Sequence, residues 1–250
     1  FTLGGWFKHA TVATNPDYLV TKQNNTAFET DTSTTLGTNL IAYWKLDETS
    51  GALVDAAETN DGTATGTTSV AGKKGNARSF NGSSDVINTG LQISPAQYST
   101  VTLEAWVKAS STPTGYHAIL SGDDGGYDRG FALSGSTYQV PVGNGTWNPG
   151  PTTTAGNWEH VVVVYSPSQI SFYFNGTEYN YGSGGSFGTS TQALQIGQDT
   201  ACGSCYYNGT IDEPAIWSKA LSAAEIKDLY NRGVGNLYKA NTNDVAIAEK

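Results

Sequence analysis

The sequence predicts an all-β protein, a two-sheet antiparallel jelly-roll sandwich with one short C-terminal helix. Charged residues make up only 14% of the chain, whereas 30 Gly, 14 Tyr and 6 Trp favour many short strands joined by tight turns. Strand-like runs of β-branched and aromatic residues recur at 101–108, 117–121, 130–134, 158–165, 169–174 and 192–197. This regular spacing, with turn signals between the runs, is typical of sandwiches and jelly rolls.

Turn residues and apolar runs define several individual strands. LIAYWKL (40–46) predicts a strand that is buried on one or both faces. HVVVVY (160–165) and ISFYF (170–174), joined by SPSQ, predict a hairpin. Asn81-Gly82 predicts a type I′ turn, because both central positions of that turn need a positive φ.

One helix is expected in LSAAEIKDLYNRG, near the C-terminus. Ser222 and Glu225 have the spacing of a capping box, which satisfies two amide donors at the start of a helix. Ile226 and Leu229 share one face, so the helix can dock on the sandwich. Gly233 is a plausible stop signal.

The chain is acidic, with 13 basic and 22 acidic residues and a formal net charge of −9. Nucleic acids and anionic membranes need clustered Lys and Arg, so neither is an expected partner. No apolar run is long enough to span a bilayer, and direct membrane insertion is therefore not expected. An acidic surface is compatible with divalent cations and with neutral sugars.

We expect the protein to act outside the cell or at its surface. The chain begins at Phe1 and contains no Met, which suggests a processed or excised product. Low charge and abundant Thr, Ser, Asn and Gly fit the same compartment.

An internal repeat and the polar segment that follows its first copy indicate where the parts of the chain begin and end. Residues 1–20 and 101–120 align without a gap and both contain the pattern of a Trp strand, a polar turn and a second strand. The first copy is an assembly arm, a remnant of a preceding domain, or a chance similarity. We place an N-terminal arm and linker at 1–38, the sandwich at 39–235 and a tail at 236–250.

Seven segments stand in order along the sandwich: LIAYWKLDETSG, SFNGSSDVINTG, VTLEAWVKAS, GNWEHVVVVY, ISFYFNG, ALQIG and YNGTIDEPAIWSKALSAAEIKDLY. Together they resemble a laminin-G-like domain of the concanavalin-A-like lectin and glucanase superfamily. The resemblance implies two packed antiparallel sheets and, often, a calcium site with a carbohydrate or protein ligand. It does not fix the ligand, because one fold serves many functions.

A structural calcium ion would need oxygen ligands from several loops. The candidate ligands are Asp47, Asp55, Asn60, Asp61 and Asp212. The first and last strands of such sandwiches usually pair, so Asp47 and Asp212 are expected to converge. The alternative is that these side chains cap turns and face water.

A second acidic segment, GDDGGYDRG, contains Asp123, Asp124 and Asp128. It lacks the full EF-hand pattern, so we interpret it first as a solvated turn and second as a metal site.

A sugar site would combine flat aromatic faces with polar side chains that reach hydroxyl groups. The predicted ligand-binding residues are Tyr116, Asp123, Asp124, Tyr127, Arg129, Trp147, Tyr206 and Tyr207. Aromatic loop residues can equally cover the edge of the core. Four tryptophans inside strand motifs are assigned to the core instead: Trp44, Trp106, Trp158 and Trp217.

The two cysteines, Cys202 and Cys205, predict a local disulfide that holds a loop between two strands, although a free pair remains an alternative. A thioredoxin-like site would need a βαβ setting, which the flanking turns do not offer. A zinc site would need further ligands, and His160 is expected to be packed in its strand.

We expect binding or assembly, not catalysis. Glycosidases of the superfamily that this sequence resembles carry a Glu-x-Asp-x-x-Glu strand, which places two carboxylates on one face as retaining chemistry requires. The sequence contains no such stretch. The first functional hypothesis is an extracellular carbohydrate-binding or adhesion module, stabilised by calcium, whose partner is a glycan or a surface protein. The alternative is a structural subunit of a surface filament or sheath that self-assembles through the strand arm in residues 1–38.

Overall fold

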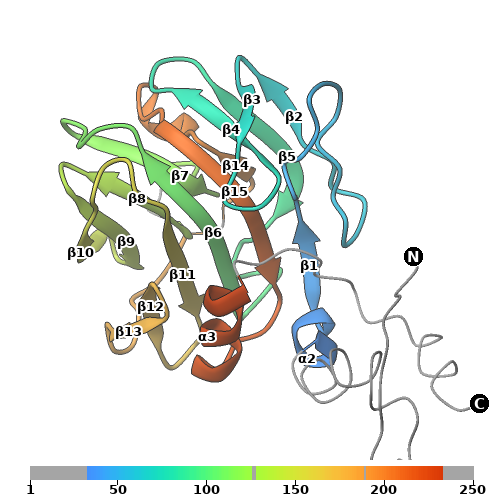
Figure 1. Cartoon of the computed structure of the whole chain (residues 1–250). Helices are drawn as coiled ribbons and strands as arrows, with labels where there is room; N and C mark the ends of the chain where they lie inside the picture. The colour runs from blue at the N-terminus through green and yellow to red at the C-terminus, as the bar shows by residue number, and fades with distance from the viewer. Residues whose placement is uncertain (1–32, 126–127, 189, 233–250) are drawn as a thin grey trace, which may run out of the picture.

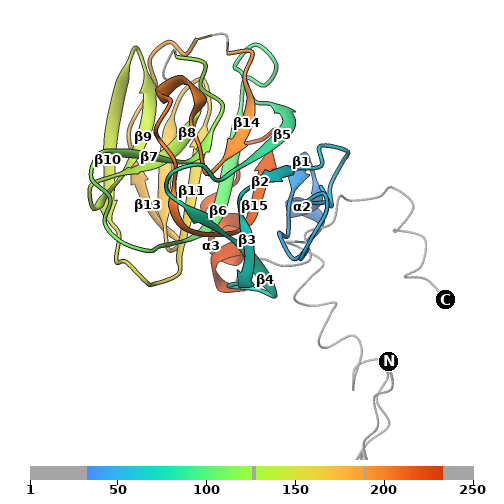
Figure 2. The ribbon, with the colours of Figure 1, turned by 90° about the horizontal axis from the view of Figure 1, so that it is seen from above.

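The computed structural model describes residues 33–125, 128–188 and 190–232. Two antiparallel sheets face each other across an apolar core, and helix α3 packs on the outside of one of them (Figures 1 and 2). In chain order the elements are α2 (Ser33–Gly37), β1 (Leu40–Tyr43), β2 (Thr63–Thr65), β3 (Thr68–Ala71), β4 (Asn76–Asn81), β5 (Val86–Gln92), β6 (Val101–Ala109), β7 (Tyr116–Ser121), β8 (Gly130–Ser134), β9 (Thr137–Gly143), β10 (Thr146–Thr152), β11 (Glu159–Tyr165), β12 (Ile170–Phe174), β13 (Thr177–Asn180), β14 (Ala193–Ile196), the 3-10 helix η2 (Thr200–Cys202), β15 (Asn208–Trp217) and α3 (Ala223–Arg232). The predicted two-sheet sandwich with a short C-terminal helix is confirmed.

The order of strands shows how the chain alternates between the two sheets. The eight-stranded sheet has the order β13-β12-β11-β6-β15-β4-β3, and β1 pairs with β15. The seven-stranded sheet has the order β10-β9-β8-β7-β14-β5-β2. Its β10 edge strand contains Pro149 and Pro151. The predicted hairpin is present, with β11 and β12 paired from Val161↔Phe174 to Tyr165↔Ile170.

Alternation of side chains along the strands divides the core from the outer faces. In β9, Tyr138 and Val140 lie in the buried core, so the intervening Gln139 points to the outer face of the seven-stranded sheet. β6 and β11 differ from this pattern because their residues are almost all buried. Their outer faces are covered by a second apolar cluster, to which α3 contributes Ile226 and Leu229.

The start of α3 follows the predicted capping box. The backbone N of Ser222 donates to the Glu225 carboxylate at 2.8 Å, and the backbone N of Glu225 donates to Ser222 Oγ at 3.3 Å. Gly233, the predicted stop, lies outside the described residues. No helix in the described segments is long and apolar enough to cross a bilayer.

The structured sandwich begins before residue 39. Leu36 in α2 is fully buried, and its carbonyl oxygen accepts a hydrogen bond from Trp217 Nε1 at 2.6 Å. The C-terminal part of the expected linker therefore packs on the sandwich, because an apolar side chain and a tryptophan donor fix it there. The repeat in residues 1–20 and the expected tail at 236–250 lie outside the described residues.

The turn at Asn81-Gly82 is not of type I′. Gly82 has a φ of 75°, but Asn81 is not among the described non-glycine residues with positive φ. Asn81 Oδ1 instead accepts hydrogen bonds from the backbone N of Ser83 at 2.8 Å and of Ser84 at 3.0 Å. The asparagine side chain closes this turn, so Asn81 itself does not need the left-handed conformation that Gly82 adopts.

The strand tryptophans and His160 are packed as expected. Trp44, Trp106 and Trp217 are at most 2% exposed, and Trp158 packs partly buried against the outer apolar cluster. His160 is fully buried, and its Nε2 lies 3.0 Å from Glu104 Oε1. Burial lowers the pKa of His160 to about 3, so its ring is neutral near pH 7.

Candidate functional site

A hollow of about 580 Å³ opens on the outer face of the seven-stranded sheet. Four neighbouring strands, β7, β8, β9 and β10, each contribute a side chain to it, and the segment between β14 and β15 forms a further wall. Its described lining consists of Tyr116, Asp123, Gly125, Ser134, Gln139, Trp147, Asp199, Ala201, Cys202 and Cys205. Three of the eight predicted ligand-binding residues are among them: Tyr116, Asp123 and Trp147.

Two aromatic rings form one side of the hollow. Tyr116 on β7 and Trp147 on β10 contact each other edge to face, with ring centroids 4.7 Å apart and planes at 69°. Both side chains are partly exposed. Edge-to-face contact fixes their orientation and leaves apolar ring surface toward the hollow.

Two carboxylates lie in the same hollow. Burial, assisted by repulsion from Asp123, raises the pKa of Asp199 to about 6. Asp123 Oδ1 accepts a hydrogen bond from the backbone N of Gly125 at 2.7 Å. Burial and the charges of Asp199 and Asp123 raise the pKa of Tyr116 well above its usual value. The hollow therefore combines aromatic surface with negative charge.

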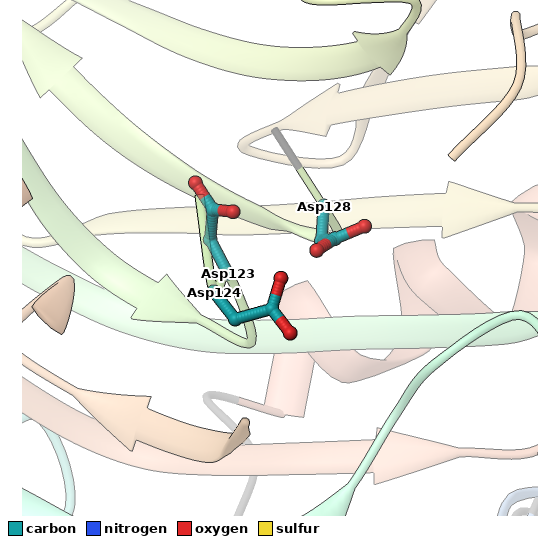
Figure 3. Close-up of side chains that lie close together, drawn as sticks. All are labelled: Asp123, Asp124 and Asp128. Carbon is teal, nitrogen blue, oxygen red and sulfur yellow. The ribbon is translucent and has the colours of Figure 1, made fainter. Parts of the chain in front are cut away.

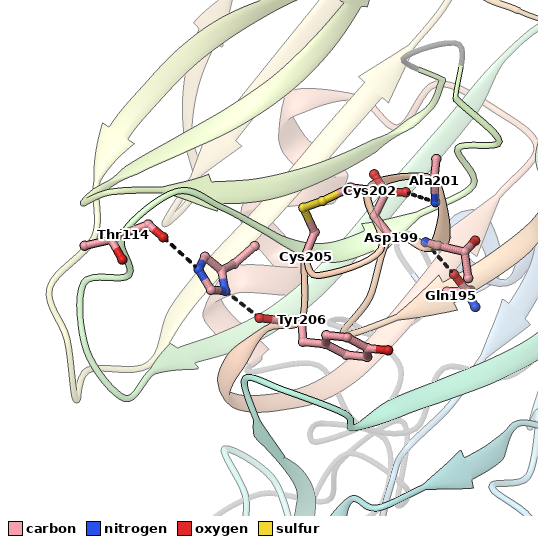
Figure 4. The surroundings of a disulfide bond; sticks show 9 residues. Thr114, Gln195, Asp199, Ala201, Cys202, Cys205 and Tyr206 are labelled. Carbon is pink, nitrogen blue, oxygen red and sulfur yellow. Dashed lines mark hydrogen bonds between the residues drawn. A yellow bond between two sulfur atoms is a disulfide. The ribbon is translucent and has the colours of Figure 1, made fainter.

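The Cys202–Cys205 disulfide forms part of the wall (Figure 4). Cys202 is exposed and Cys205 is buried. Asp199 caps the short helix η2 that leads to the disulfide, because its Oδ1 accepts the backbone N of Ala201 at 2.9 Å. The predicted disulfide is therefore present, and it holds the loop that positions Asp199.

Asp123 also belongs to an acidic cluster with Asp124 and Asp128 (Figure 3). One oxygen from each carboxylate lies within 4.8 Å of the others, and no other group of this kind occurs among the described residues. Asp128 is only 2% exposed, and neither of its carboxylate oxygens makes a regular hydrogen bond to those residues, although the backbone amides of Asp124 and Gly188 lie close enough to favour its charged form. Burial, followed by the charges of Asp123 and Asp124, raises the pKa of Asp128. The segment is a solvated turn only at Asp124, because Asp123 and Asp128 are buried.

The remaining predicted ligand-binding residues lie elsewhere. Tyr207 is 1% exposed and packs in the core against Phe80, so its placement in a ligand site was wrong. Arg129 is 4% exposed, and its guanidinium donates to the carbonyl oxygens of Ile93, Tyr98 and Ser99, so it holds a loop instead of facing the hollow.

Tyr206 and Asp124 lie beside the hollow and do not line it. Tyr206 pairs with Ala118 through its backbone. Asp124 Oδ2 accepts the backbone N of Thr191 at 3.0 Å. Tyr127 lies outside the described residues.

The predicted calcium ligands form two separate groups that bind backbone amides. Asp55 Oδ1 accepts the backbone N of Tyr43 at 2.9 Å, and Asp55 Oδ2 accepts the backbone N of Asn60 at 3.1 Å. Asp61 Oδ1 accepts the backbone N of Asp55 at 2.9 Å. These three residues close the loop between β1 and β2.

Asp47 and Asp212 meet at a different loop, that between β3 and β4. Asp47 Oδ1 accepts the backbone N of Asn76 at 2.7 Å, and Asp212 Oδ2 accepts those of Lys73 and Lys74 at 2.7 and 2.9 Å. Burial raises the pKa of Asp212 to about 7, and Asp47 adds a smaller increase. The two acids approach one segment, but the five predicted ligands do not form one cluster.

Sequence reasoning did not place Ser134 and Gln139 in the ligand site. Strand alternation would have assigned Gln139 to the outer face, since it stands between the core residues Tyr138 and Val140. It would not have shown which outer-face residues share a hollow, because that depends on strand order.

The comparison with protein families matches this architecture. The model for the concanavalin A-like lectin/glucanases superfamily matches residues 81–227, which is more than half of the chain. The chain belongs to this superfamily. A 95-residue stretch of this superfamily member is 30% identical to the human (Homo sapiens) adhesion G-protein coupled receptor D1. That match covers 36% of the chain and 11% of the receptor, so the chain spans only a small part of that relative.

Solved structures show the same fold at low sequence identity. Domain 4 of AbnA, an extracellular arabinanase of Geobacillus stearothermophilus in complex with arabinotriose, is 19% identical with a TM-score of 0.56, over 77% of this chain and 98% of that one. A sialidase of Trypanosoma rangeli in complex with sialic acid is 18% identical with a TM-score of 0.61, over 77% and 32%. The binding domain of botulinum neurotoxin DC, with rat synaptotagmin II, is 11% identical with a TM-score of 0.61, over 79% and 52%.

Proposed function

We propose that this chain is a non-catalytic carbohydrate-binding module whose site is the hollow on the outer face of the seven-stranded sheet. The observation that supports it is the arrangement of Tyr116 and Trp147 beside Asp123, Gln139 and Asp199 in one hollow. Small-molecule sites typically join apolar surface with a few convergent polar groups. A sugar ring matches this pair of surfaces, because its C–H face is apolar and its hydroxyl groups donate to carboxylates and amides.

The comparisons support a binding role without fixing the ligand. Domain 4 of the arabinanase was solved with arabinotriose and the sialidase with sialic acid, so sandwiches of this fold occur in sugar-binding proteins. The neurotoxin domain was solved with a protein. A protein partner is therefore the competing ligand class, and a binding screen distinguishes the two.

We further propose that a calcium ion binds at Asp123, Asp124 and Asp128. The carboxylate of Asp128 is buried beside two other acids and makes no regular hydrogen bond to the described residues, which suits oxygen ligation of a divalent cation. A divalent ion would balance three adjacent negative charges and fix the segment that carries Asp123 into the hollow. The calcium ligands expected from the sequence are the alternative site for the ion, although most of their described hydrogen bonds go to backbone amides.

A module of this kind is expected to work outside the cell or at its surface. The Cys202–Cys205 disulfide fits an oxidising compartment. The similarity to an adhesion receptor points the same way.

A glycan array followed by titration calorimetry tests the proposal. Trp147→Ala should weaken the best sugar ligand about 30-fold, since truncation of an aromatic anchor costs about 2 kcal/mol. Tyr179→Ala is the matched control, because Tyr179 is 41% exposed on β13 of the other sheet. Equal binding by both variants would exclude the hollow as the site. Release of sugar from any bound oligosaccharide would contradict the non-catalytic role.

A further inference from the structure

A second hollow, of about 470 Å³, lies next to β5 of the same sheet. Its polar lining includes Glu58, Asn60, Gln92 and Gln97, and Tyr98 also borders it. Gln92 and Gln97 are exposed, and Tyr98 is partly exposed. The lining of this hollow is more polar than that of the first, so it offers mainly hydrogen-bond donors and acceptors.

Gly90 leaves this second hollow open toward the strand. A Cβ atom at Gly90 would meet only Asn60 Oδ1 within 4 Å, at 3.8 Å. Asn60 itself is held in place, because its Nδ2 donates to Asp55 Oδ2 at 3.2 Å and its carbonyl oxygen accepts Trp44 Nε1 at 2.8 Å. The loop between β1 and β2 thus presents a fixed amide oxygen above a strand position that has no side chain.

The two hollows are joined by a short chain of hydrogen bonds. Asp124, in the acidic cluster, accepts the backbone N of Thr191 at 3.0 Å, and the carbonyl oxygen of Thr191 accepts Gln92 Nε2 at 2.8 Å. Arg129 Nη1 also donates to the carbonyl oxygen of Tyr98 at 2.6 Å. The segment that carries Asp123 into the first hollow therefore fixes residues of the second.

Strand order brings β7 of the first hollow and β5 of the second close together. β7, β14 and β5 are neighbours, and Gln195 on β14 is opposite both Ser121 on β7 and Asn88 on β5. Two strand spacings separate β7 from β5, which is about 10 Å. Gln195 itself is only 4% exposed, because its Nε2 donates to Asn88 Oδ1 at 2.8 Å and its Oε1 accepts the backbone N of Thr200 at 3.2 Å. The exposed polar residues beside β14 are Asn88 and Thr191.

We propose that the second hollow is a further carbohydrate subsite, so that the domain binds an extended oligosaccharide across β7, β14 and β5 instead of a single sugar unit. This inference rests on the proposed function of the first hollow. Two rigidly connected subsites bind one chain more tightly than either alone, because binding at the first holds the chain near the second.

Calorimetric titration with neutral oligosaccharides of one to six units tests the proposal, with arabino-, xylo-, cello- and manno-oligosaccharides as probes. The affinity of the wild-type protein should rise with chain length by about tenfold or more, the equivalent of about 1.4 kcal/mol. Gly90→Val, which fills the second hollow, and Gln97→Ala, which removes an exposed amide from it, should each remove that increase and leave the affinity for the shortest bound sugar unchanged. Thr177→Val, on exposed β13, is the control.

The outcomes separate the two proposals. Affinity that does not depend on chain length, or a length dependence that both variants retain, overturns the second subsite and leaves the first hollow standing. Failure of every saccharide to bind overturns both. Thermal midpoints of the variants identify any loss of folding, and Gln97→Ala provides the decisive comparison if Gly90→Val is unstable.

Discussion

Removal of one buried charge tests the calcium proposal most directly. Asp128 is 2% exposed and its carboxylate makes no regular hydrogen bond to the described residues, so Asp128→Asn keeps the shape of the side chain and removes the charge that would bind the ion. Calcium at one hundred times its Kd should stabilise the wild-type protein by about 2.7 kcal/mol. For a domain of this size that corresponds to an increase in Tm of about 5 to 11 °C. The variant should show no such increase.

The same substitution has a second expected effect, without calcium. The pKa of Asp128 is raised in the folded state, so the folded protein binds more protons than the unfolded chain. With chelator present, stability should therefore fall as the pH rises from about 3.9, the unfolded value, through the raised folded pKa. Asp128→Asn should reduce this slope, and calcium should reduce it in the wild-type protein.

Differential scanning calorimetry with calcium or with chelator measures both effects. Asp47→Asn is the matched control, because Asp47 belongs to the sequence-predicted set of calcium ligands and accepts a backbone amide at the loop between β3 and β4. An equal calcium-dependent increase in Tm for wild type and Asp128→Asn would refute the reasoning. If Asp47→Asn alone lost the calcium-dependent increase in Tm, the sequence-predicted ligands would be the calcium site instead.

Three further predictions follow from the site and the packing. Sugar affinity should fall as the pH drops through about 6, because protonation of Asp199 removes a charged acceptor, and calorimetry of Asp199→Asn should show weaker binding without that dependence. Replacement of Cys202 and Cys205 by Ser should lower the free energy of unfolding by about 2 kcal/mol, since the bond closes a very short loop, and denaturant titration measures this. Ile226→Ala in α3 should cost about 2 to 5 kcal/mol in the same assay, because Ile226 is fully buried; a loss below 1 kcal/mol would mean that α3 packs loosely.

The fold could be predicted from the sequence because its signals are local. Alternating strands, the hairpin formed by β11 and β12, and the capping box at Ser222 each depend on residues close together in the chain. The predicted run at 130–134 matches β8 in both bounds. Strands β9 and β10 were missed, since TYQVPVG and TWNPGPT contain the Gly and Pro that otherwise indicate loops.

The candidate site could be predicted only in part, because it depends on which strands become neighbours. Tyr116, Asp123 and Trp147 were selected as aromatic or acidic loop residues, and the hollow contains all three. Tyr207 is also an aromatic loop residue, but its side chain points into the core. In an extended segment a shift of one residue moves a side chain from one face to the other, so the local sequence does not decide between the two positions. Arg129 could not be assigned either, since its acceptors are carbonyl groups about 30 residues away in sequence.

The prolines of β10 bear on how copies of this domain can stand beside one another. An edge strand normally offers unpaired amides on which another sheet can grow. Pro149 and Pro151 remove two donors from this edge strand, and Trp147 of the same strand lines the first hollow. The residues that discourage strand addition are thus adjacent to the hollow proposed as the sugar site. Neighbouring copies of this domain are therefore not expected to pair through β10 and cover that hollow.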